Sequence, residues 1–293
     1  MSVNKYKAFL AAVECGSLTE AAKRLYYTQS AISRMVADLE SQWGVVLLNR
    51  KKSGVSLTTA GRALLPYIRQ VCSDEQRLDG VLRDMTGLKT GVVRLGTVTA
   101  IANEWLPIIL KKFIKTAPGV EFEILIGNGE IISQWLKEDR IDVGLFSANK
   151  DDHLNTQLLH FDEFRVIFPK GHPLGQLEKV PLKALNDYPY ILHGASWCKP
   201  LEEGLKNAEQ KIPIRYTTVG ATSIVNLVRD GIGVSILPKL LLENDKAKVE
   251  SRPLDPPLSR RIDIVTHGVP TMPAVKEFLT QLPKILAGRA KTH

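Results

Sequence analysis

A heptad repeat of apolar side chains is the feature that most constrains the architecture of this chain. The repeat consists of Leu64, Val71, Leu78 and Met85, with Ile68 and Leu82 between them. It predicts one long amphipathic helix over 59–87, bent or loosened near Pro66. The apolar stripe either joins two copies of the chain or packs on the chain's own domains. The helix divides the chain into a short N-terminal part and a longer C-terminal part.

Basic residues are concentrated in the short N-terminal part. Residues 1–62 contain nine Lys and Arg against four Asp and Glu, whereas residues 91–293 contain 26 against 23. A small basic unit attached to a nearly neutral body favours a polyanionic partner. A merely solubilising surface would have the same composition.

The overall composition, 44% hydrophobic and 24% charged, is that of a globular protein, and 293 residues predict about two domains. No apolar run reaches the roughly 18–20 residues that span a bilayer, so we expect no membrane contact. No apolar segment of the secretory type follows Met1. Cys15, Cys72 and Cys198 are an odd number at wide spacing. They favour a reducing, cytoplasmic location over a disulfide framework.

The first 58 residues predict three helices and a hairpin. The expected helices are 3–14, 19–25 and 29–43, with the hairpin over 45–57. Ser17 and Thr28 are suited to cap the second and third helices, and Gly16 and Gly44 to end the first and third. This order predicts a helix-turn-helix followed by a wing.

The third helix has an apolar inner face, which leaves polar side chains outward in its first two turns. The candidate DNA-binding residues are Thr28, Gln29, Ser30, Ser33 and Arg34 on this helix and Arg50, Lys51 and Lys52 on the hairpin. Gln, Ser and Arg side chains bind base edges and phosphates in a major groove. A three-helix scaffold with a solvated face would show the same pattern.

Several segments of this region carry a family resemblance. They are Ala8-Phe9, Gly16–Leu25, Thr28–Arg34, Leu39-Glu40, Gly44–Arg50 and Val55–Gly61. They resemble the winged helix-turn-helix of LysR-type transcriptional regulators, with Ser30 and Leu48 where the family usually has Pro and Phe. The resemblance implies that double-stranded DNA is a partner and that 59–87 is a dimerising linker helix. It also implies assembly as a dimer or a homotetramer.

From residue 92 onward, predicted strands and helices alternate, which favours a doubly wound α/β body. The expected strands are 92–98, 120–126, 141–146, 165–169, 190–193, 215–219, 234–237 and 262–266. The expected helices are 103–116, 130–138, 182–185, a segment near 200–210, 223–230 and 274–286. The body resembles the family's effector-binding domain, 92–293, and through it periplasmic binding proteins. By resemblance, lobe one is 92–161 with 268–293, and lobe two is 162–267.

The body lacks the signatures of an enzyme. The glycines of Asp230–Gly233 follow a predicted helix and precede a strand, the reverse of a dinucleotide loop. The segment Gly194–Cys198 is not a nucleophile elbow, and the six histidines lack metal-ligand spacing. We therefore expect no catalysis, no cofactor and no metal.

A ligand site is expected at the carboxyl ends of the parallel strands, near helix N-termini whose free amides attract a carboxylate or similar anion. The candidates are Thr99, Ala100, Asn128, Gly129, Phe146 and Ser147 in lobe one, Ser196, Trp197, Cys198, Ala221 and Thr222 in lobe two, and His267 at the crossover. Helix capping and core packing explain several of them equally well. The predicted function is transcriptional regulation through a small effector; the alternative is a small-molecule binding protein without a DNA function.

Overall fold

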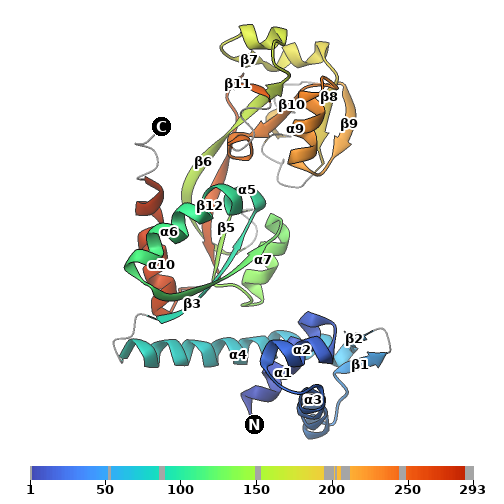
Figure 1. Ribbon diagram of the computed structural model, residues 1–293, viewed down its shortest axis with the longest axis vertical. Coiled ribbons are helices and arrows are strands. Elements are labelled where there is room, and N and C mark those ends of the chain that lie inside the picture. The colour runs from blue at the N-terminus through green and yellow to red at the C-terminus, as the bar shows by residue number, and fades with distance from the viewer. Residues whose placement is uncertain are drawn as a thin grey trace.

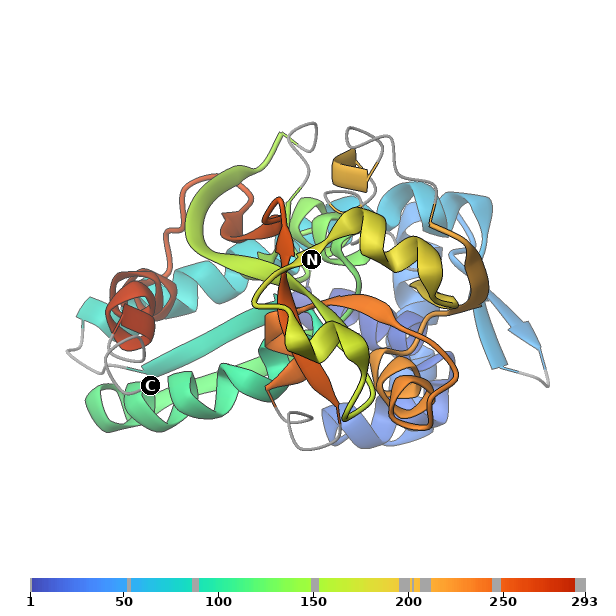
Figure 2. The same ribbon diagram turned by 90° about the horizontal axis from the view of Figure 1, so that it is seen from above.

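The computed structural model describes residues 2–51, 54–85, 90–148, 153–194, 201, 203–205, 212–243 and 249–287. Figure 1 shows a small N-terminal module attached to the long helix α4 (Thr59–Met85), which lies across the foot of a two-lobed body. In the view from above, the module gathers at one end of α4 (Figure 2). The order predicted from the sequence is confirmed: winged helix-turn-helix, long helix, two-lobed α/β domain.

The N-terminal module is built from three helices and one antiparallel hairpin. They are α1 (Val3–Cys15), α2 (Leu18–Leu25), α3 (Gln29–Trp43), β1 (Leu48–Lys51) and β2 (Gly54–Leu57). Both predicted caps are confirmed, since the Ser17 hydroxyl accepts the Glu20 amide at 3.4 Å and the Thr28 hydroxyl accepts the Ala31 amide at 3.2 Å. Gly44 ends α3 with a φ of 66°, a conformation that glycine adopts without strain.

Helix α4 begins after Thr58, whose hydroxyl accepts the Gly61 amide at 2.9 Å, and continues through Pro66 as one element. Its first turns belong to the module. Ile68 is only 3% exposed in the module's core, and Leu64 packs against the same core. These two positions of the predicted seam are therefore corrected, because the chain itself covers them.

The rest of the stripe on α4 is exposed in the single chain. Leu78 is 60% exposed and Leu82 is 52% exposed, and Val71 is exposed as well. Tyr67, one turn before Val71, extends the same face, although the heptad pattern did not include it. The side chain of Met85 lies outside the described residues.

Lobe one is a sheet covered by helices on both faces. Its elements are β3 (Thr90–Thr97), α5 (Thr99–Glu104), α6 (Leu106–Thr116), β4 (Gly119–Ile126), α7 (Gly129–Lys137), β5 (Val143–Phe146) and α10 (Pro273–Ala287). Strand β3 is parallel to both β4 and β5. Phe113 of α6 and Phe278 of α10 pack edge to face on one side, and Ile132 and Leu136 of α7 are buried on the other. This is the doubly wound arrangement expected from the alternation.

In the described part of the chain, lobe two contains one end of the eight-stranded sheet that continues from lobe one, and a separate two-stranded sheet of β8 (Tyr190–His193) and β9 (Ile214–Thr218). Its other elements are β7 (Val180–Pro181), α9 (Ala221–Arg229), β10 (Ser235–Pro238) and β11 (Glu250–Asp255), with 3-10 turns at Pro173–Gln176, Leu182–Asp187 and Lys239–Leu242. Strand β11 was not predicted. The helix expected near 200–210 falls largely outside the described residues, although 203–205 are helical.

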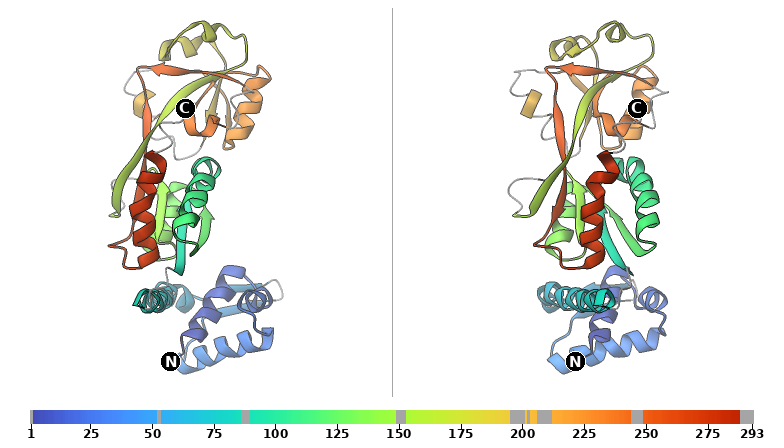
Figure 3. Two further views of the ribbon diagram at one scale, coloured as in Figure 1. Left: turned by 60° about the vertical axis from the view of Figure 1, so that its left-hand side comes forward. Right: turned by 90° about the vertical axis from the view of Figure 1, so that its left-hand side faces the viewer.

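Two long strands connect the lobes (Figure 3). They are β6 (Asn155–Phe168) and β12 (Ser259–Thr266), which pair antiparallel from one lobe to the other. The sequence predicted only 165–169 of the first, because its polar first half shows no alternation. Asp263–Val265 already pair with β5, so the second crossing comes earlier than the expected boundary after 267.

Candidate functional site

The outward face of α3 carries the polar residues expected there. Ile32, Val36 and Leu39 are buried in the module, whereas Gln29 and Arg34 are exposed. Thr28 and Ser30 are exposed too, with their hydroxyl oxygens 3.0 Å apart, and Ser33 is half-buried. The face thus offers an amide, hydroxyls and a guanidinium over two turns, a set that can hydrogen-bond to base edges and phosphates.

In the wing, Arg50 is already paired within the module. Its guanidinium donates to the Ser33 hydroxyl and to the Glu40 carboxylate, both at 3.1 Å. Glu40 also accepts the amides of Leu47 and Leu48, at 2.8 and 3.0 Å. Arg50 therefore braces the wing against α3, and its side chain is still 39% exposed. Lys51 is exposed, and Lys52 lies outside the described residues.

The turn between α2 and α3 presents two aromatic side chains that the sequence reasoning did not assign. Tyr26 is 96% exposed with a φ of 57°, and Tyr27 is exposed beside it. In the sequence, only their position immediately before the polar face of α3 indicates a role in DNA binding. A tyrosine there can donate its hydroxyl to a phosphate.

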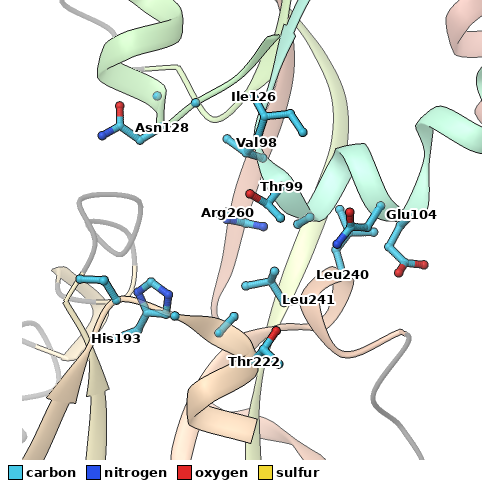
Figure 4. A pocket seen from close by; sticks show the side chains of 17 residues that line it. Val98, Thr99, Glu104, Ile126, Asn128, His193, Thr222, Leu240, Leu241 and Arg260 are labelled. Carbon is cyan, nitrogen blue, oxygen red and sulfur yellow. The ribbon is translucent and has the colours of Figure 1, made fainter. Parts of the chain in front are cut away.

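A pocket of about 560 Å³ lies between the two lobes (Figure 4). Six of the predicted ligand residues line it: Thr99, Ala100, Asn128, Gly129, Ala221 and Thr222. Helix α7 begins at the pocket from lobe one and α9 begins there from lobe two, as the strand-end rule predicts. The Asn128 side chain caps α7 by accepting the Ile131 amide at 2.9 Å.

Other predicted ligand residues lie elsewhere. Phe146 is buried next to Gly129. A Cβ atom placed on Gly129 would lie 3.3 Å from the Phe146 ring. Ser147 is not among the lining residues. His267 faces a different cavity, with its Nδ1 3.5 Å from Asp139. Ser196, Trp197 and Cys198 lie outside the described residues.

The pocket contains a buried ion pair that the sequence did not reveal. Arg260 of β12 lines the pocket and donates to Asp162 of β6 through Nε at 3.0 Å and a terminal nitrogen at 2.8 Å. The other oxygen of Asp162 accepts the Leu240 amide at 3.0 Å. This ion pair thus links β6 and β12, the two strands that connect the lobes, at the wall of the pocket.

His193 at the end of β8 is a second lining residue that was missed. Burial, with the positive charge of Arg260, lowers the pKa of its imidazole to about 4. It is therefore neutral near pH 7. Among the described lining residues, the only Arg, Lys, Asp or Glu side chains are Arg260, which is paired with Asp162, and Glu104. Figure 4 shows Glu104 at one side, away from Asn128 and His193.

Comparison with known proteins places both parts of the chain in one family. Residues 3–62 match the bacterial regulatory helix-turn-helix profile of the LysR family, and residues 86–286 match the LysR substrate binding domain. The chain belongs to the LysR family. It is a DNA-binding transcriptional regulator with an effector-binding domain and not an enzyme, which excludes the alternative of a binding protein without a DNA function.

Relatives of this LysR-family chain match over most of its length. It is 30% identical over 288 residues to the probable HTH-type transcriptional regulator LrrA of Synechococcus elongatus, with 96% of each chain covered. It is 29% identical to the transcriptional activator CmpR of Synechocystis sp., covering 80% of this chain and 78% of that one.

Solved structures share the fold. A full-length OxyR variant of Pseudomonas aeruginosa superposes with a TM-score of 0.74 at 20% identity, covering 97% of each chain. CbnR in complex with its target DNA superposes with a TM-score of 0.69 at 20% identity, covering 97% of this chain and all of that one.

The described residues show two further absences. They contain no helix long and apolar enough to cross a membrane. Within the same ranges, no three His, Cys, Asp or Glu side chains are grouped so that they could hold a metal ion.

Proposed function

We propose that a small effector binds in the pocket between the lobes and alters how the LysR-family regulator holds its DNA. The observation that carries this proposal is a pocket lined by both lobes, with Thr99 on one side and Thr222 on the other. A ligand touching both walls binds best when the lobes stand at one particular separation. It therefore shifts the population toward that arrangement.

The chemistry of the pocket favours a small carboxylate or a similar anion. Helices α7 and α9 direct their N-termini toward the pocket, and the positive end of the helix dipole attracts negative charge. The hydroxyls of Thr99 and Thr222 add neutral donors, and the guanidinium of Arg260 lies at the wall. Neutral His193 can donate one hydrogen bond without a proton being taken up.

Thr99→Val tests the pocket, because valine keeps the shape and removes the hydroxyl. If that hydroxyl binds the effector, the variant is expected to bind it about 2–12-fold more weakly, the loss of one neutral hydrogen bond. DNA affinity without ligand should stay unchanged. A panel of small carboxylates and their amides, screened by thermal shift with the wild type, supplies the probe.

The matched control for this experiment is Thr280→Val, since Thr280 is exposed on α10 and does not line the pocket. It should respond to each carboxylate as the wild type does. Equal binding by the Thr99 and Thr280 variants would remove Thr99 from the site. A screen in which no carboxylate stabilises the wild type more than its amide would contradict the anion proposal.

We infer that DNA is contacted by the outward face of α3 and by the wing. The proposed contacts are Thr28, Gln29, Ser30, Ser33 and Arg34, with Arg50 and Lys51 from the hairpin. All of them except the half-buried Ser33 are exposed, and the pairing of Arg50 with Glu40 holds the wing beside α3, which supports this assignment. A helix of this length fits a major groove, and its first turns meet the base edges.

We also infer self-association through α4, by the stripe Tyr67, Val71, Leu78 and Leu82. An exposed apolar stripe one to two residues wide along a helix is the pattern of a coiled-coil seam. Pairing would set two copies of α3 at a fixed spacing, which predicts a roughly palindromic DNA site.

Leu78→Glu with Leu82→Glu is expected to lower the molar mass in solution toward that of the monomer, because like charges would meet across the seam. Sedimentation equilibrium measures this. Leu177→Glu is the matched control, an exposed leucine in lobe two. A wild type that is already monomeric, or a double variant with the mass of the wild type, would refute pairing through this face.

A further inference from the structure

Polar side chains join the described part of the linker helix α4 to lobe one. Arg69 of α4 forms an ion pair with Glu138, and both side chains are largely buried. One turn further along α4, Ser73 is 2% exposed and accepts a hydrogen bond from Arg94 of β3 at 3.4 Å. Both contacts are on the side of α4 opposite the exposed stripe, by helical geometry.

Each of these lobe-one residues lies on an element that also reaches the pocket. Glu138 follows the last residue of α7, and Asn128 and Gly129 at the start of α7 line the pocket. A helix of nine residues is about 14 Å long and moves as a unit. Arg94 lies on β3, whose end leads directly into Val98 and Thr99, which line the pocket too.

Both contacts are held firmly from the lobe-one side. The Gln134 side chain donates to Glu138 at 2.8 Å. Asp142 binds Arg94 through two guanidinium nitrogens, at 2.7 and 3.2 Å, and accepts its backbone amide at 2.8 Å. These side chains are thus fixed to α7 and to the sheet, so a shift of either element shifts the atoms that meet α4.

On its other side, α4 is fixed to the DNA-binding module. Ile68 is buried in the module's core, and Glu75 pairs with Lys7 of α1 at 2.5 Å. The first half of α4 and the module therefore form one packed body. Its orientation relative to lobe one is set in part by Arg69 and Ser73.

We propose that α7 and β3 relay effector binding in the pocket to α4, because their movement is transmitted through the Arg69–Glu138 and Arg94–Ser73 contacts. These four residues are then positioning residues of the regulatory response. The inference rests on the proposed function, since it takes the interlobe pocket as the effector site. Figure 1 shows the geometry it requires, with α4 lying beneath lobe one.

A charge-exchange series in the full-length protein tests the relay. Its backgrounds are wild type, Arg69→Glu, Glu138→Arg and the double exchange, which restores an ion pair of reversed polarity. Pocket occupancy is imitated by Thr222→Trp, which places a large side chain in the pocket from lobe two, away from both contacts. The readout is amide hydrogen exchange in peptides covering 66–76 of α4.

Thr222→Trp is expected to change exchange in 66–76 by about 2–30-fold in the wild type and in the double exchange, and to have no effect in the two single variants. A merely structural role of the ion pair would give the same Thr222→Trp effect in all four backgrounds, and that result would overturn the relay. So would the absence of any change at 66–76 in the wild-type background. Lys183→Glu, a charge reversal on the surface of lobe two, should behave as wild type.

DNA affinity of the Thr222→Trp variant separates the relay from the function on which it rests. Unchanged affinity, with exchange at α4 altered, would refute control of DNA by the pocket and leave the relay standing. Altered affinity with no change at α4 would refute the relay alone. If Thr222→Trp does not fold, Thr222→Phe takes its place. Arg69→Lys, which keeps the charge, should retain the response.

Discussion

Arg34→Ala is expected to weaken binding to the specific DNA site by about 1–3 kcal/mol, or roughly 5–150-fold. Arg34 is exposed in the second turn of α3, on the face that Ile32 and Val36 leave outward. From there a guanidinium reaches a guanine edge or a phosphate. Thermal stability should be unchanged, because the Arg34 side chain is exposed and not part of the module's core.

The measurement is fluorescence anisotropy on a duplex selected from random sequence by the wild-type protein. Arg34→Lys separates two kinds of contact. Lysine keeps a phosphate contact but loses a bidentate contact with guanine. If Arg34 contacts a phosphate, the salt dependence of binding by the alanine variant should fall by about one unit of slope.

Arg229→Ala is the control for net charge, since Arg229 is exposed in lobe two and pairs only with its neighbours Asp230 and Asn226 among the described residues. It should bind the selected duplex like the wild type. If Arg34→Ala does the same, then Arg34 is not part of the interface. The contacts would then have to come from Gln29, Ser30 and the wing.

Local signals in the sequence predicted the N-terminal module closely. Ser17, Thr28 and Gly44 act within a few residues of their own positions, so their caps and helix ends could be read directly. Arg50 could not be read in this way. Its partner Glu40 lies on another element, and only the fold shows that the charge is already paired.

The repeat on α4 illustrates a different limit. Periodicity identifies one face of a helix, but it does not say what covers each part of that face. Ile68 is covered by the module, whereas Leu78 and Leu82 are left exposed in the single chain. Packing on the chain's own module thus explains the first turns of the stripe, and pairing of two copies is our proposal for the later turns.

In the body, the strand-end rule located Thr99, Gly129 and Thr222, because it depends only on the order of the elements. It could not locate Arg260 or His193. These residues are far apart in sequence, and neither belongs to a recognisable motif. Both line the pocket because β12 crosses between the lobes and β8 ends at the same opening, which is a consequence of tertiary structure alone.

The first half of β6 escaped prediction for a related reason. The segment from Asn155 to Glu163 alternates little between polar and apolar residues, because these residues cross between the lobes and several are exposed. Asp162 is the exception, being almost fully buried. The sequence gives no reason for a buried carboxylate at this position, because its partner Arg260 lies on the neighbouring strand β12.

Asp162→Ala is expected to cost about 3–5 kcal/mol of stability, the largest loss we predict for a single substitution. It would leave the Arg260 guanidinium buried without a counter-charge and the Leu240 amide without its acceptor. An exposed pair of the same residue types contributes at most about 1 kcal/mol, so burial decides the size of the effect. Urea denaturation followed by tryptophan fluorescence measures the loss in the effector-domain transition.

Replacing both partners separates two contributions to the free energy of unfolding: the destabilisation by an unpaired buried charge, and the net stabilisation by the ion pair. Asp162→Leu with Arg260→Met should be far more stable than Asp162→Ala, because no charge is left buried. A single variant within about 1 kcal/mol of wild type would show that water reaches the guanidinium. The double variant then reveals what the ion pair does for function. If the pair sets the angle between the crossing strands, a stable protein without it should bind the selected duplex but lose its response to the carboxylate found by screening.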